Sequence, residues 1–101
     1  MTKFAFELDD SAEAELYNIV DYYKQFDHSL SSDFIQEFER AVQRLLDFPK
    51  AGSPYLHDTN RFILRRFPYA IVYKIYRDEV IVAHAVMHMK RKPDYWKERL
   101  K

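Results

Sequence analysis

Residues 88–96, HMKRKPDYW, bring together the side chains of this sequence that could do chemistry. Histidine is the side chain whose unperturbed pKa, about 6.5, suits proton transfer near neutral pH, and His88 supplies one. Lys90, Arg91 and Lys92 follow it and could neutralise a phosphate or a carboxylate. Tyr95 and Trp96 add two aromatic rings. The simpler interpretation is a solvated basic run followed by an aromatic pair that packs on the body of the domain.

Motifs for several other chemistries are missing from the chain. The sequence has no HExxH zinc motif, no phosphate-binding P-loop and no GxSxG nucleophile turn. It also has no cysteine, which excludes disulfides and thiolate metal sites and fits a reducing compartment. We therefore expect no cofactor and no metal.

The formal net charge of zero conceals a strong asymmetry along the chain. Residues 1–60 hold five Lys or Arg against twelve Asp or Glu, a balance of −7, and residues 61–101 hold eleven against four, a balance of +7. Clustered positive charge is the footprint of a surface that binds phosphates or acidic groups. Acidic helices packed beside basic strands would produce the same asymmetry, so the charge alone does not choose between these interpretations.

Length and hydropathy indicate one ordinary globular domain, residues 1–101. A chain of 101 residues with 48% hydrophobic content can bury one compact core. The first residues, MTKFAFELDD, lack the basic and apolar regions of a signal peptide. No apolar run approaches the roughly 20 residues that a membrane span needs. We expect a soluble, cytoplasmic protein without membrane contact.

Hydrophobic periodicity predicts a strand and then two helices. Residues 3–8 alternate as a half-buried strand does, and Asp9 or Asp10 can cap a helix that extends to about residue 26. Three serines, at positions 29, 31 and 32, are candidate N-caps for a second helix that extends to about residue 48. The short link predicts an antiparallel helix hairpin. Proline and glycine then predict a loop through about residue 60.

The rest of the chain predicts three strands and a short helix. The strands cover residues 61–67, 70–77 and 80–87, with a hairpin turn at 77–79, and the helix covers 93–100. The order β-α-α-β-β-β predicts an α+β fold, in which the helix hairpin packs on one face of a small, mainly antiparallel sheet.

Alternation along the last two strands predicts which residues face the helices. The set expected beneath the helices is Ile71, Tyr73, Ile75, Ile81, Ala83, Ala85, Met87 and Met89. The set expected on the opposite face is Ala70, Val72, Lys74, Tyr76, Val80, Val82, His84, Val86 and His88. The second set would give the open face of the sheet a histidine and cationic character.

Two stretches of the sequence resemble a known family. RRFPYAIVY, residues 65–73, and HMKRKPDYW, after a strand and a helix hairpin, resemble the RelE/ParE superfamily of bacterial toxin–antitoxin toxins. The resemblance covers nearly the whole chain and implies the fold described above. It also implies a growth-inhibiting toxin that a cognate antitoxin protein holds inactive.

The superfamily divides by target, and the resemblance implies different residue roles in each branch. In the ribosome-dependent mRNA endoribonucleases, His88, Lys90 and Arg65 would be catalytic, because RNA cleavage needs proton transfer and cations for the phosphorane charge. In the ParE-like branch the toxin poisons DNA gyrase. In either branch Arg61, Arg91, Lys92, Tyr95 and Trp96 are the candidate residues for binding the substrate or target.

Departures from the ribonuclease pattern favour the ParE-like branch. Ala70 and Ile63 stand where many ribosome-dependent members have cationic residues, and the 49–60 loop has no glutamate to act as a general base. The leading hypothesis is therefore a toxin acting on a protein such as DNA gyrase. The second is a metal-independent endoribonuclease acting on mRNA in the ribosome, and the third is a non-toxic homologue that only binds its antitoxin.

Overall fold

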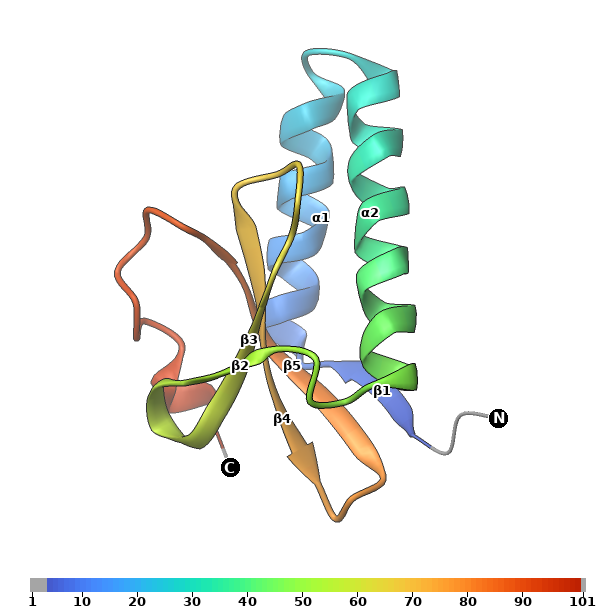
Figure 1. Ribbon diagram of the computed structural model, residues 1–101. Coiled ribbons are helices and arrows are strands. Elements are labelled where there is room, and N and C mark those ends of the chain that lie inside the picture. The colour runs from blue at the N-terminus through green and yellow to red at the C-terminus, as the bar shows by residue number, and fades with distance from the viewer. Residues whose placement is uncertain (1–3, 101) are drawn as a thin grey trace.

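In the computed structural model, which describes residues 4–100, two helices form the predicted antiparallel hairpin (Figure 1). Helix α1 covers Asp10–Lys24 and α2 covers His28–Asp47. Asp9 caps α1 by accepting the Ala12 N–H at 2.8 Å, as predicted. The serine N-caps predicted for α2 are wrong, because the Asp27 carboxylate accepts the Ser29 N–H at 2.8 Å and starts the helix earlier.

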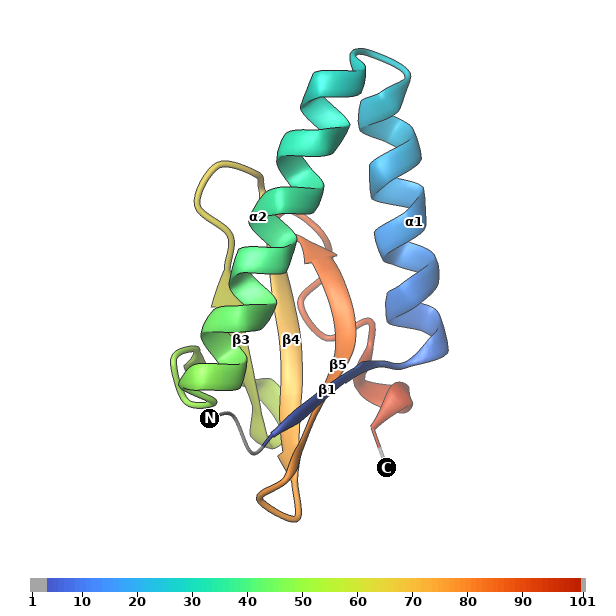
Figure 2. The ribbon, with the colours of Figure 1, turned by 90° about the vertical axis from the view of Figure 1, so that its right-hand side faces the viewer.

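Within the described residues, five strands form a mixed sheet in the order β1-β5-β4-β3-β2. Their bounds are Ala5–Leu8, Ser53–Tyr55, Thr59–Ile63, Tyr69–Tyr76 and Val80–His88 for β1 to β5. Strand β1 pairs parallel to β5, and the other pairs are antiparallel. The α+β architecture is confirmed, while Lys3, which was predicted to begin the first strand, lies outside the described residues. Figure 2 shows β1 beside β5, with the chain passing from the end of β1 into α1.

Three segments differ from the prediction. Strand β2 lies in the expected loop, where Pro54 is tolerated because β2 is an edge strand. Residues 65–67 leave the sheet because the Glu37 carboxylate accepts the backbone N–H groups of Arg65 and Arg66. The helix expected at 93–100 is only a 3-10 turn, η2, at Lys97–Arg99.

The main core lies between the sheet and the helix hairpin. Phe34, Leu45, Ile71, Tyr73 and Ile81 are fully buried there. Gly52, the only glycine in the sequence, sits at the edge of this core. A Cβ on it would lie 2.8 Å from both the Arg61 carbonyl oxygen and the Tyr73 hydroxyl, so no larger residue fits. The Tyr73 hydroxyl accepts the Gly52 N–H and donates to the Pro49 carbonyl oxygen at 2.7 Å.

A β-bulge at His84 changes which residues of β5 face the helices. Val72 pairs with Ala85 but Tyr73 pairs with Ala83, which leaves His84 as the extra residue. Up to the bulge the prediction is confirmed, because Ile81 and Ala83 face the helices. Beyond it the prediction is reversed: Val86 joins the main core. The residues Ala85 and Met87 face the other way, and Met89 is exposed.

The face of the sheet opposite the helices carries a second, smaller core. Val72, Ala85 and Met87 are buried there against Trp96, which is itself fully buried. Figure 1 shows the C-terminal segment crossing this face, with the helix hairpin on the other side of the sheet. The predicted open sheet face is therefore wrong over this region, because the segment after β5 covers it.

Candidate target-binding surface

His88 ends β5 on the helix side of the sheet, opposite to the predicted face. Its ring packs edge-on against Tyr69, with the ring centroids 5.0 Å apart. Its Nδ1 accepts the backbone N–H of Lys90 at 3.0 Å. Because this bond needs a lone pair on Nδ1, it favours the neutral tautomer that carries its proton on Nε2. The β-bulge at His84 causes this reversal, because it inverts the alternation of side chains in the rest of β5.

A groove of about 270 Å³ runs between His88 and α1. Glu15, Asn18 and Tyr22 from the helix and Arg91 from the segment after β5 line it with the histidine. A histidine, an arginine, a carboxylate and two tyrosine rings, those of Tyr22 and Tyr69, thus meet at one end of the sheet. This arrangement can bind a partly charged, partly aromatic surface.

Tyr95 connects this groove to the C-terminal segment. The Arg91 guanidinium lies over its ring at 3.9 Å, and its hydroxyl donates to Glu15 Oε2 at 2.8 Å. Burial, and next the hydrogen bond to Glu15, raise the pKa of the Tyr95 phenol above its ordinary value. The Tyr95 hydroxyl is consequently a neutral donor that orients the Glu15 carboxylate, and the Tyr95 ring packs against the Arg91 guanidinium.

Lys90 and Lys92 are exposed in the loop that follows β5. Among the described residues neither side chain makes an ion pair, so both charges face solvent and are available to a partner. Together with Arg91 they form the cationic end of the surface. Lys101 lies outside the described residues.

Arg61 and Trp96 belong to the opposite face of the sheet. The Arg61 guanidinium lies over the Tyr55 ring at 4.3 Å, and that ring packs against Trp96 at a centroid distance of 5.9 Å. Trp96 is fully buried, so its role in the described fold is to pack the C-terminal segment onto the sheet. The structure places Arg61 on the rim of that packing.

Arg65 lies apart from His88 and Lys90. It lines a groove of about 590 Å³ against α2, with Arg40 and Arg44, whereas His88 lines the groove against α1. The three residues that a ribonuclease would use therefore do not share a cavity. His84 is also removed from the surface: it is fully buried, with Nδ1 2.9 Å from Asp9 Oδ2 and Nε2 2.9 Å from the Tyr76 hydroxyl.

Sequence reasoning missed Glu15, Arg99 and Tyr55. Glu15 sits on an amphipathic helix, where a glutamate ordinarily faces solvent, yet it accepts bonds from the Tyr95 hydroxyl, the Arg99 guanidinium and the Val86 N–H. These partners lie 71 to 84 positions away along the chain. No local pattern signals contacts over such separations.

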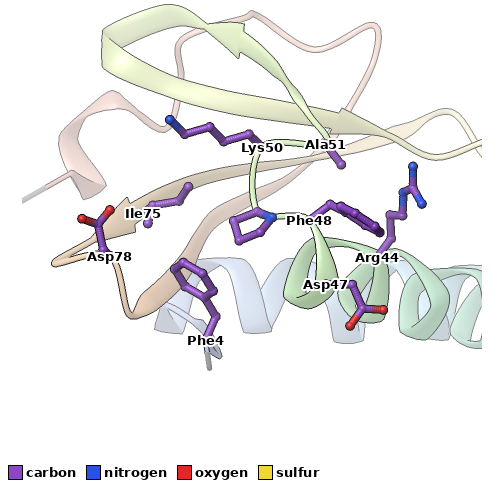
Figure 3. Close-up of a pocket in the computed structure, with 9 residues that line it drawn as sticks. Phe4, Arg44, Asp47, Phe48, Lys50, Ala51, Ile75 and Asp78 are labelled. Atoms are coloured by element: carbon purple, nitrogen blue, oxygen red, sulfur yellow. The ribbon is translucent and has the colours of Figure 1, made fainter. Parts of the chain in front are cut away.

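A further cavity, of about 710 Å³, lies at the other end of the molecule (Figure 3). Arg44 and Phe48 stand beside each other at the end of α2, with the Arg44 guanidinium 4.7 Å from the ring centre. Lys50 and Asp78 border the opening on other sides. Its lining has one carboxylate from the α2 end, one from the β4–β5 turn, and no histidine, so it is not arranged for acid–base chemistry.

Two further properties concern the whole described part of the chain. Within residues 4–100 no three His, Asp or Glu side chains are grouped closely enough to hold a metal ion. None of the helices formed by these residues is long and apolar enough to span a membrane.

Comparison with known proteins identifies a family for most of the chain. Residues 6–93 match the family described as ParE toxin of type II toxin-antitoxin system, parDE. No curated protein sequence matches the chain. A solved structure described as "Chromosomal ParDE TA system from P. aeruginosa" has a similar fold, with a TM-score of 0.74 over 87% of this chain and 98% of that chain. The two sequences are 15% identical, so this likeness concerns the fold.

Proposed function

We propose that this chain, which belongs to the ParE toxin family of type II toxin–antitoxin systems, inhibits growth by binding a protein target, and that this target is DNA gyrase. The family establishes the coarser function, a ParE-like toxin with a cognate antitoxin as its partner. The proposal goes beyond the family in naming DNA gyrase as the target.

The observation that carries the proposal is the separation of the would-be catalytic residues. An endoribonuclease needs its proton-transfer group and its phosphate-binding cations around one scissile bond. Here His88 and Arg65 line different grooves, and the Nδ1 atom of His88 accepts a backbone N–H. Ala70 adds no cation, because it is a buried residue of β4. A target-binding surface made of Lys90, Arg91 and Lys92 does not require a proton-transfer group and phosphate-binding cations to converge.

The second candidate function is cleavage of mRNA in the ribosome. One observation favours it, namely that Arg91 lines the same groove as His88 and could place a guanidinium beside a phosphate there. In that function His88 would transfer the proton, while Lys90, Arg65 and Arg61 would contact phosphates.

Purified components test the choice of target. We expect the free toxin to inhibit supercoiling by gyrase and to accumulate cleaved DNA, while translation of a reporter mRNA continues at its normal rate. Addition of the co-expressed product of the adjacent reading frame should reverse the inhibition of gyrase. Loss of translation with cut mRNA and unaffected gyrase would assign the chain to the ribonuclease branch instead. No effect on either system would favour the non-toxic homologue.

A further inference from the structure

Four arginines face each other in two pairs across the groove beside α2. Arg40 and Arg44 stand four residues apart on the helix and therefore on one side of it. Arg65 and Arg66 stand opposite, in the loop that joins β3 to β4. The groove has a volume of about 590 Å³, and its apolar lining consists of Ala41, Phe62 and Leu64.

The positive charge of this groove is only partly neutralised from within the described part of the chain. The Glu37 carboxylate is nine-tenths buried and accepts the backbone N–H groups of Arg65 and Arg66, so it holds the loop rather than a guanidinium. Asp33 reaches Arg66 at 3.4 Å, in an exposed pair. Arg40, Arg44 and Arg65 form no ion pair with a described residue.

Hydrogen bonds and packing within the protein fix the loop that forms one side of the groove, without a ligand. Glu37 fixes the start of the loop, and the loop closes through two backbone bonds, from Leu64 N–H to the Tyr69 carbonyl and from Tyr69 N–H to the Phe67 carbonyl. The Phe67 ring is buried against Phe34 and Tyr23. A preformed site loses less conformational entropy when it binds.

We propose that this groove binds an acidic segment of the cognate antitoxin, with carboxylates paired to Arg40, Arg44 and Arg65 and an apolar side chain on the floor. The proposal rests on the partner stated under the proposed function and adds the place and chemistry of its contact. Arginine pairs bidentately with carboxylates, which suits two opposed rows of guanidinium groups.

The floor of the groove favours a peptide over a nucleic acid. Single-stranded nucleic acids bind basic grooves through exposed aromatic rings on which bases stack. The aromatic ring in this groove, Phe62, is packed against the main core, and the other floor residues are aliphatic. Arg44 also borders the larger cavity that holds the exposed Phe48, so an apolar and acidic segment could continue from one site into the next.

Charge reversal tests the proposal in the complex itself. The probe is the product of the adjacent reading frame, purified with the toxin, separated and titrated back at several salt concentrations. We expect the double variant Arg40→Glu/Arg65→Glu to weaken this binding at least tenfold at low salt and to flatten its salt dependence. Lys24→Glu/Lys97→Glu, which reverses two exposed cations elsewhere, is the matched control and should leave the affinity within about twofold. Thermal unfolding should show that both variants fold.

Each other outcome overturns the proposal. Unchanged antitoxin affinity in the groove variant, or an equal loss in the control, means that the groove is not the contact. Loss of affinity for a labelled single-stranded DNA oligonucleotide with full antitoxin affinity would assign the groove to nucleic acid. A wild-type chain that does not bind the neighbouring product also refutes it. The target proposal is judged separately by gyrase inhibition with the free toxin, so the two can fail independently.

Discussion

Glu15 and Arg99 form a bidentate ion pair that takes the place of a neighbouring strand beside β5. The two guanidinium nitrogens lie 3.0 and 3.1 Å from the two carboxylate oxygens. The carboxylate also accepts the Val86 N–H at 3.0 Å, and the guanidinium donates to the His84 carbonyl oxygen at 2.8 Å. Beyond the residues that β1 reaches, the Val86 N–H and the His84 carbonyl of β5 are therefore satisfied, which reduces the tendency of this edge to pair with another chain.

Removing this pair should destabilise the fold. Arg99→Ala leaves the partly buried Glu15 carboxylate with one fewer charged donor and uncovers the His84 carbonyl oxygen. We expect a loss of about 2 kcal/mol in the free energy of unfolding, measured with urea. Arg99→Lys should recover only part of it, because an ammonium group cannot donate through a planar fork. Lys97 lies on the same turn but is exposed, so Lys97→Ala should change the free energy of unfolding by less than about 0.5 kcal/mol. A loss as large as that of Arg99→Ala would contradict this prediction.

Trp96 should report whether the C-terminal segment is docked. It is the single tryptophan and is fully buried, so its fluorescence emission should be blue-shifted in the native state. Trp96→Ala should cost about 4 kcal/mol, because it empties the second core. Trp96→Phe should cost much less, since the indole N–H has no hydrogen-bond partner among the described residues. A red-shifted native spectrum, quenched freely by acrylamide, would show that the segment does not cover the sheet.

Alkaline pH should destabilise the protein through Tyr69. Burial, with a further contribution from Tyr23, raises the pKa of the Tyr69 phenol from 10.0 to about 12. The unfolded state therefore releases the Tyr69 proton near pH 10, and the folded state releases it only near pH 12. The contribution of this group to the free energy of unfolding is complete below pH 10 and is lost as the pH rises toward 12. Tyr69 should account for about 2 kcal/mol of that loss at pH 12. Urea titrations of the wild type and Tyr69→Phe between pH 9 and about 12 measure it, and parallel curves would refute the assignment.

His88→Ala should leave toxicity nearly intact if the target is a protein. A ribonuclease that uses this histidine for proton transfer would lose on the order of 10²-fold or more in cleavage. Growth of cells that express each variant, with antitoxin binding as the folding control, separates the two outcomes. The companion change is Lys90→Ala/Lys92→Ala, which we expect to weaken toxicity more. Removing the whole segment after β5 is a poorer test, because it would also expose the second core.

The order of the main elements could be predicted from the sequence, apart from the edge strand β2, but the faces of the sheet beyond the middle of β5 could not. Alternation correctly placed Ile71, Tyr73, Ile81 and Ala83 beneath the helices, because those positions follow the regular pleat. It failed from Ala85 onward. His84, the extra residue of the bulge that inverts the pattern, bonds to Asp9, 75 positions earlier, and no local signal in the VAHAV stretch indicates such a partner.

The candidate surface was predictable in composition more than in arrangement. The basic run after His88 and the packing of Tyr95 and Trp96 could be inferred from residue type. The division of the cations between the loop after β5, the groove beside α2 and the opposite face of the sheet could not be inferred in this way. Arg65 leaves the sheet because a glutamate on α2 accepts its backbone N–H, and Arg61 is turned toward Tyr55 by a strand that was expected to be loop. The first cause is a contact between distant positions, and the second is a short edge strand that contains a proline.

The parallel pairing of β1 with β5 sets an order of events during synthesis. Residues 5–8 leave the ribosome early, yet their partners at 80–83 are made only after both helices and the other strands of the sheet. Contacts between such distant positions slow folding, because the intervening chain must be ordered before they form. The nascent chain thus remains without the pairing of β1 with β5, and without the basic surface after His88, until translation has nearly passed through the domain.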